Sequence, residues 1–130
     1  MIIFYADDDA EDCDFFGEAL RKIDASTEYS TASNGREALQ MLHNASELPD
    51  YIFLDINMPL MDGKACLQEI KKIIRLKHIP VIMYSTTSDT KEIKKCYDLG
   101  AFDFLIKPNE FQKLCEDLIS IFTELKRQQQ

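Results

Sequence analysis

The chain has 130 residues, of which 45% are hydrophobic and 29% charged, and its formal net charge is −8 at pH 7. This length predicts one domain with an ordinary core, and the composition is that of a soluble globular protein without a membrane span. The excess of acids leaves no basic stripe for nucleic acid, so we expect protein partners, with no direct nucleic acid and no membrane among them.

The cysteines and histidines do not form a motif. The four cysteines, at 13, 66, 96 and 115, lack the paired spacing of zinc sites, and the two histidines are isolated. The first apolar run is short and acids follow it at once, so it does not predict a signal peptide. We therefore expect reduced thiols and a cytoplasmic protein.

The first part of the chain predicts a strand, a helix and a second strand. The apolar run at 2–5 predicts a strand that ends at Asp7 and Asp8. Apolar residues then recur at helical spacing over 13–23, with acids before them and basic residues at the end, as the helix dipole favours. The polar segment 27–32 predicts an edge strand.

The middle of the chain continues this alternation. Asn34-Gly35 leads into a second helix, and the apolar run at 51–54 predicts a buried strand that ends at Asp55. A third helix is expected from Gly63 to near His78. Its inward-facing residues are predicted to be Leu67, Ile70 and Ile74.

The last part of the chain predicts two more strands, each followed by a helix. The runs at 81–84 and 102–106 end at Ser85 and Lys107. The fourth helix is expected to be capped by one of three residues and to stop at Gly100, while the fifth carries one long apolar stripe. The candidate caps are Ser88, Asp89 and Thr90 for the fourth helix, and an Asn109–Gln112 capping box for the fifth.

Regular alternation of strands and helices with apolar middle strands predicts an α/β fold, a doubly wound five-stranded parallel sheet with helices on both faces. The polar second strand belongs at an edge, which favours the flavodoxin-like order 2-1-3-4-5. In that order the first and third strands are neighbours. Asp7, Asp8 and Asp55 would then meet at the crevice where ligands bind in open sheets.

These side chains suit a particular chemistry. Three neighbouring acids repel one another, and a small hard cation such as Mg²⁺ relieves the repulsion. One carboxylate can then serve as the nucleophile toward phosphorus, with an ammonium and a hydroxyl nearby. The residues alone therefore predict phosphoryl chemistry on an aspartate.

Four motifs in chain order carry a resemblance to a known family. They are Asp7-Asp8, the segment 55–63 (DINMPLMDG), Ser85 and Lys107-Pro108, each directly after a predicted strand. With them the chain resembles the receiver domain of two-component response regulators, of the single-domain chemotaxis-regulator type. The resemblance implies a receiver domain at 1–126 and a short tail at 127–130.

The resemblance also implies a ligand set for the cation. Asp8 and Asp55 would bind Mg²⁺ directly, Asn57 would bind through its backbone carbonyl, and Asp7 would bind through water. Mn²⁺ is the alternative ion. Asp55 would be the phosphoacceptor, and Lys107 would neutralise charge on the phosphoryl oxygens.

Further residues are assigned to switching and lifetime by the same resemblance. The Ser85 hydroxyl would bind the phosphoryl group, and Phe104 would turn inward behind it. Asn57 and Thr87 would tune hydrolysis, and Thr86 would limit access to the site. The peptide bond before Pro108 is often cis in the family, although trans is favoured from sequence alone.

The implied activity is signalling by a phosphoprotein in a two-component system or phosphorelay, with no catalysis beyond its own phosphorylation and dephosphorylation. The donor would be a sensor histidine kinase or a phosphotransfer protein, and an unknown output protein would bind the face of the fourth helix, fifth strand and fifth helix. A monomer or a weak homodimer is expected, because Tyr97 and Phe102 would leave apolar surface on that face.

Two alternatives stay open. One is a receiver-shaped scaffold that works without phosphorylation, although a scaffold has no need for mutually repelling acids. The other is a phosphohydrolase of the haloacid dehalogenase type, since Asp7 and Asp9 form an Asp-x-Asp. That family expects threonine or valine where Glu11 stands.

Overall fold

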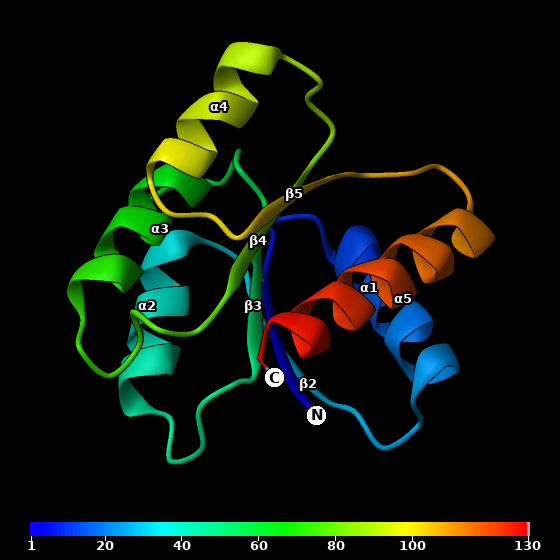
Figure 1. The fold of residues 1–130 in the computed structure, drawn as a ribbon. Helices are drawn as coiled ribbons and strands as arrows, with labels where there is room; N and C mark the ends of the chain where they lie inside the picture. Colours follow the sequence, from blue (N-terminus) through cyan, green and yellow to red (C-terminus); the bar gives the residue numbers. More distant parts are fainter. Residues whose placement is uncertain (130) are drawn as a thin grey trace.

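The computed structural model describes residues 1–129 and contains one sheet of five parallel strands (Figure 1). The strand order is β2-β1-β3-β4-β5, as predicted, so β1 lies between β2 and β3. The polar strand is at an edge, and all four residues of β3 are buried. The strands are β1 (Ile2–Ala6), β2 (Glu28–Ala32), β3 (Tyr51–Leu54), β4 (Val81–Ser85) and β5 (Asp103–Ile106).

Five helices cover the two faces of the sheet. Figure 1 shows α1 and α5 side by side on one face and α2, α3 and α4 on the other. Within the described residues, no helix is both long and apolar enough to cross a membrane. The helices are α1 (Ala10–Ile23), α2 (Gly35–Asn44), α3 (Gly63–Lys72), α4 (Thr90–Asp98) and α5 (Phe111–Gln128).

The C-terminal part of the chain is helical almost to the end of the described residues. The domain boundary expected at 126 falls within the last turn of α5, and Gln130 of the expected tail lies outside the described residues.

The two faces of the sheet have different cores because successive strand residues point to opposite sides. Ile3 and Tyr5 of β1 face α1 and α5, while Phe4 and Ala6 face the other helices. The α1–α5 core is rich in aromatic rings, and the opposite core is mostly aliphatic. The buried aromatic residues of the α1–α5 core are Tyr5, Phe16, Tyr51, Phe53, Tyr84 and Phe122.

Most helix caps follow from local sequence. Asp89 caps α4 by accepting the Lys91 N–H, as one of the three candidates, and Gly100 follows that helix with a φ of 107°. The predicted capping box at Asn109 is wrong. Helix α5 begins after Glu110 without a side-chain cap, and its stability comes from its buried stripe instead.

Helix α3 is shorter than predicted. It ends at Lys72, and Ile74 is 81% exposed, so the predictions of an inward Ile74 and an end near His78 are wrong. The chain leaves the helix in a turn where the Leu76 N–H bonds to the Ile73 carbonyl. This turn buries Leu76 and Ile79 ahead of β4, and that burial outweighs another helical turn.

Candidate functional site

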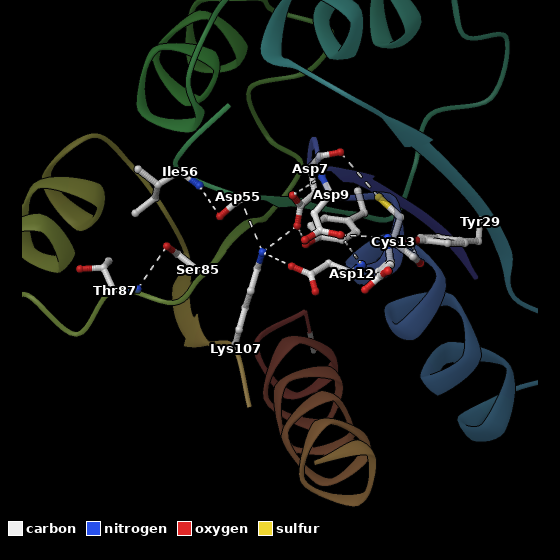
Figure 2. A network of polar contacts seen from close by, with 12 residues as sticks. Asp7, Asp9, Asp12, Cys13, Tyr29, Asp55, Ile56, Ser85, Thr87 and Lys107 are labelled. Carbon is white, nitrogen blue, oxygen red and sulfur yellow. Dashed lines mark hydrogen bonds and ion pairs between the residues drawn. The ribbon is translucent and has the colours of Figure 1, made fainter. Parts of the chain in front are cut away.

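The sheet brings the predicted site residues to one edge. Asp7 and Asp8 follow β1, and Asp55 follows β3, so the three carboxylates lie at the crevice between neighbouring strands. Each offers one oxygen within 4.8 Å of the others. Ser85 ends β4 and Lys107 follows β5, and Figure 2 shows both beside Asp55.

Gly63 allows the loop after β3 to fold back tightly onto Asp55. Its N–H donates to the Ile56 carbonyl at 2.8 Å. A Cβ atom at position 63 would lie 2.0 Å from the backbone oxygen of Asp55, which no side chain could tolerate. The glycine of the Asp62-Gly63 pair therefore fixes the backbone beside Asp55, and Asp62 caps α3.

Asp7 is buried, and both of its carboxylate oxygens have partners. Oδ2 accepts hydrogen bonds from the Tyr5 hydroxyl and from Lys107 Nζ, the latter at 2.7 Å. Oδ1 accepts the Asp9 N–H at 3.0 Å. These bonds hold Asp7 in place and leave little capacity for direct metal binding.

Asp55 is the central carboxylate and is only 7% exposed. Oδ1 accepts the Ile56 N–H at 2.9 Å, and Oδ2 lies 3.7 Å from Lys107 Nζ. Burial raises the pKa of Asp55 to about 7, with the neighbouring Asp7 adding to the rise and Lys107 opposing it. A bound cation would favour the ionised form of this carboxylate.

Lys107 lies between acids from two elements. Its Nζ donates to Asp7 at 2.7 Å and to Asp12 of α1 at 2.8 Å, and it lies 5.4 Å from the centre of the Tyr84 ring. Burial alone would lower the pKa of Lys107, but the hydrogen bonds to Asp12 and Asp7 outweigh it and raise the pKa above its usual value. The ammonium is therefore charged at neutral pH.

The residues from the end of β4 onward range from buried to exposed. Ser85 is buried, and its Oγ accepts the Thr87 N–H at 3.4 Å. Thr86 is exposed and Thr87 is half-buried. The Ser85 hydroxyl is therefore joined to the loop that leads into α4 (Figure 2).

Three other predicted positions lie around this centre. Asn57 is exposed on the loop after β3, and Phe104 is half-buried against the aliphatic core. The peptide bond before Pro108 is trans, like every other peptide bond of the described residues.

Two side chains of the network were not predicted. Tyr5 stands two residues before Asp7, so the period of a strand places them on one face and could have indicated the contact. Asp12 was interpreted only as an acid of the first helical turn. Its pairing with Lys107 joins α1 to the end of β5, and no spacing within one element reveals that.

This arrangement is suited to the transfer of a negatively charged group onto a carboxylate. Hard oxygen ligands at Asp8 and Asp55 fit a divalent cation, and a carboxylate can act as a nucleophile toward phosphorus. The Lys107 ammonium and the Ser85 hydroxyl lie where they could meet a group attached to Asp55.

Comparisons with known proteins agree with this geometry. Residues 3–119 match the model of the response regulator receiver domain. Among curated relatives, a protein-glutamate methylesterase/protein-glutamine glutaminase of Methanococcoides burtonii is 34% identical over 112 residues. The DNA-binding transcriptional regulator NtrC of Escherichia coli K12 is 42% identical over 98 residues.

These curated relatives are much longer than the matched region. The matches cover 84% and 73% of this chain, but only 30% of the methylesterase and 20% of NtrC. The similarity therefore carries neither esterase activity nor DNA binding to this chain.

Solved structures of similar size match over nearly their whole length. The phosphorylated cyanobacterial phytochrome response regulator RcpA is 32% identical with a TM-score of 0.85, covering 92% of this chain and 89% of that one. The Mn²⁺-bound response regulator Rcp1 is 27% identical with a TM-score of 0.81, and the coverages are 92% and 90%. The chemotaxis response regulator CheY4 of Vibrio cholerae is 28% identical with a TM-score of 0.80, and the coverages are 92% and 97%.

Proposed function

This chain belongs to the receiver domains of two-component response regulators, and we propose that it accepts a phosphoryl group on Asp55 in a Mg²⁺-dependent reaction and thereby controls a partner protein. The observation that carries the proposal is the convergence of Asp7, Asp8 and Asp55 beside the Lys107 ammonium at the sheet edge. The match of residues 3–119 to the family supports it.

The donor set fits Mg²⁺, with Mn²⁺ as the alternative. Asp8 and Asp55 would bind the ion directly, Asn57 would add its backbone carbonyl, and Asp7 would act through a water. The three hydrogen bonds that Asp7 already accepts from protein donors support this indirect role. The bound ion would supply positive charge beside the transferring group. The similar response regulator Rcp1 is known in a Mn²⁺-bound form, which supports a divalent cation as the ligand.

Asp55 would attack the phosphorus atom of a phosphohistidine in line. A bond forms between an Asp55 oxygen and phosphorus, the phosphorus–nitrogen bond breaks, and the imidazole leaves with the electron pair and takes up a proton from solvent. Lys107 would neutralise charge on the phosphoryl oxygens. Because the pKa of Asp55 is raised to about 7, the ionised nucleophile depends on this positive surrounding.

Loss of the phosphoryl group would regenerate the carboxylate. A water molecule attacks phosphorus, the bond to the Asp55 oxygen breaks, and inorganic phosphate leaves. We propose that Asn57 and Thr87 tune this step by placing or excluding the water. The exposed Thr86 would limit access to the site.

The output would come from a packing change next to the site. The buried Ser85 hydroxyl would turn to the phosphoryl group and draw in the loop that it already contacts through Thr87. Phe104, half-buried on β5, would fill the space behind it. The face of α4, β5 and α5 would then shift toward the state that an output protein binds.

The partners follow from the same chemistry. The donor would be a sensor histidine kinase or a phosphotransfer protein, and the output partner would be a protein, with no direct contact to nucleic acid or membrane. We propose a cytoplasmic monomer or weak homodimer. Tyr97 on α4 is 44% exposed and gives such a dimer an apolar contact.

Intact-protein mass spectrometry tests the proposal. Wild type, Asp55→Asn and the surface control Asp14→Asn are incubated with a small phosphodonor in the presence or absence of Mg²⁺. We expect a phosphoryl adduct in wild type and Asp14→Asn only with Mg²⁺, and none in Asp55→Asn. An adduct that persists in Asp55→Asn would place the nucleophile elsewhere. No adduct in wild type, even from a phosphorylated histidine kinase, would favour the scaffold alternative.

A further inference from the structure

Asp12 places a further carboxylate beside the site, and the proposed chemistry does not use this carboxylate. It lies in the first turn of α1, and its Oδ2 is 2.8 Å from Lys107 Nζ, nearly as close as Asp7 Oδ2 at 2.7 Å (Figure 2). Asp55 Oδ2 is farther from the same ammonium, at 3.7 Å. Lys107 is therefore bound by two acids before any phosphoryl group is present.

The two bound acids differ in how easily they could release Lys107. The side chain of Asp7 is fully buried, so losing the ammonium would leave a buried charge unpaired at high cost. The side chain of Asp12 is 38% exposed, and water can replace the ammonium there. Asp12 is thus the partner that Lys107 would give up.

The charges around Lys107 indicate how Asp12 would influence a phosphoryl group on Asp55. Three carboxylates, from Asp7, Asp12 and Asp55, lie within 3.7 Å of the Lys107 ammonium. Asp8 lies beside Asp7 and Asp55, and a phosphoryl group would add further negative charge. An acid in contact with Lys107 reduces the positive potential that this lysine can direct toward Asp55. The long lysine side chain is already held by burial and by Asp7, so it does not need Asp12 to reach the site.

Building on the proposed function, we infer that Asp12 is a positioning residue that competes with a phosphoryl group on Asp55 for the Lys107 ammonium. It thereby weakens the phosphorylated state. Replacing its charge would free Lys107 for the phosphoryl group. If the ion pair between Asp12 and Lys107 were purely structural, removing the Asp12 charge would instead weaken binding of the phosphoryl group, because the site would become looser.

The test is a titration of beryllofluoride, a mimic of the phosphoryl group, in the presence of Mg²⁺, followed by ¹⁹F NMR. Four proteins are compared: wild type, Asp12→Asn, Asp12→Glu and Asp14→Asn. Asp14 is exposed on the same helix, so its substitution removes the same charge without touching Lys107. We expect Asp12→Asn to bind about threefold to fivefold more tightly than wild type. Asp14→Asn should change binding less than about twofold, and Asp12→Glu should return to the wild-type value.

The outcomes separate this inference from the proposed function. If wild type binds beryllofluoride but Asp12→Asn matches Asp14→Asn, or binds more weakly than wild type, the inference is overturned and the proposed function stands. If wild type binds no beryllofluoride, the inference is overturned, and the proposed function is overturned with it if a phosphorylated histidine kinase also leaves no adduct. Thermal unfolding of each variant identifies any loss of binding that comes from loss of the fold.

Discussion

Helices α4 and α5 flank the same strand, β5, but the protein holds them very differently. Helix α5 buries six residues, from Leu114 to Leu125, against the aromatic core. Helix α4 buries only Cys96. It is also held by an ion pair between Glu92 and Lys64 at 2.7 Å and by a hydrogen bond from the Tyr97 hydroxyl to Asp103 at 3.0 Å.

This difference indicates which part of the face formed by α4, β5 and α5 could move at a low cost in free energy. Polar contacts at a partly exposed surface contribute little to the free energy of unfolding, whereas each large buried side chain contributes a few kcal/mol. The loop that ends at α4 begins at Ser85, next to Asp55, and that loop is mostly exposed. Within the face of α4, β5 and α5, we therefore expect a change at the site to displace α4 more than α5.

Truncation of one buried residue in each helix gives the largest expected contrast. Leu118→Ala should lower the free energy of unfolding by about 3 kcal/mol, because it leaves a cavity in a fully buried position. Cys96→Ala removes a single sulfur atom and should cost about 1 kcal/mol. Urea unfolding measures both. Equal losses would mean that α4 is anchored as firmly as α5.

Substitution of Asp55 alters the charged site without touching either helix. The pKa of Asp55 is raised to about 7 in the folded protein, so the folded state holds its proton more tightly than the unfolded state does. In the wild type, the Asp55 carboxyl group therefore contributes to the free energy of unfolding at low pH. This contribution is lost as the pH rises from the usual pKa of an aspartate to about 7. Asp55→Asn should raise the free energy of unfolding by about 1 kcal/mol at pH 8, and by progressively less toward pH 4.

Urea unfolding of wild type and Asp55→Asn across this pH range checks the effect, with Asp14→Asn as the exposed control. Equal stability of Asp55→Asn and wild type at pH 8 would show that the site holds no unfavourable charge. In that case the loose attachment of α4 alone would have to account for its movement.

Removal of one ion pair from each helix gives the smallest expected difference between α4 and α5. Glu92→Gln removes the ion pair to Lys64 of α3, and Glu124→Gln removes the pair to Arg127 within α5. Each pair is worth about 0.5 kcal/mol. We expect amide exchange in α4 to rise about twofold in Glu92→Gln, and exchange in the middle of α5 to stay unchanged in Glu124→Gln. Hydrogen exchange with mass spectrometry measures both, and an equal rise in the two helices would remove the contrast.

Much of the sheet and the central site could be predicted from sequence, because both follow from rules with few exceptions. Buried parallel strands are apolar throughout, and their ends meet at one edge, which placed Asp7, Asp8 and Asp55 together. Lys107 beside Asp7 follows from the same rule.

The errors lie where competing contacts decide the structure. Ile74 fits the helical period, but the burial of Leu76 and Ile79 ends α3 earlier. Asn109 fits a capping box, but α5 begins later, after Glu110. Asp12 joined the network through the packing of α1 beside the end of β5, which spacing along the chain does not record. The contact of Tyr5 with Asp7 does follow the period of a strand and was missed.

The most direct test of this account is hydrogen exchange of the wild-type protein with Mg²⁺, with and without beryllofluoride, read segment by segment. We predict that exchange changes in the loop at 86–89 and in α4 and β5, while the middle of α5 stays as it was. An unchanged α4, or a change of equal size in the buried part of α5, would contradict the claim that chemistry at Asp55 is transmitted through the loosely held side of the fold.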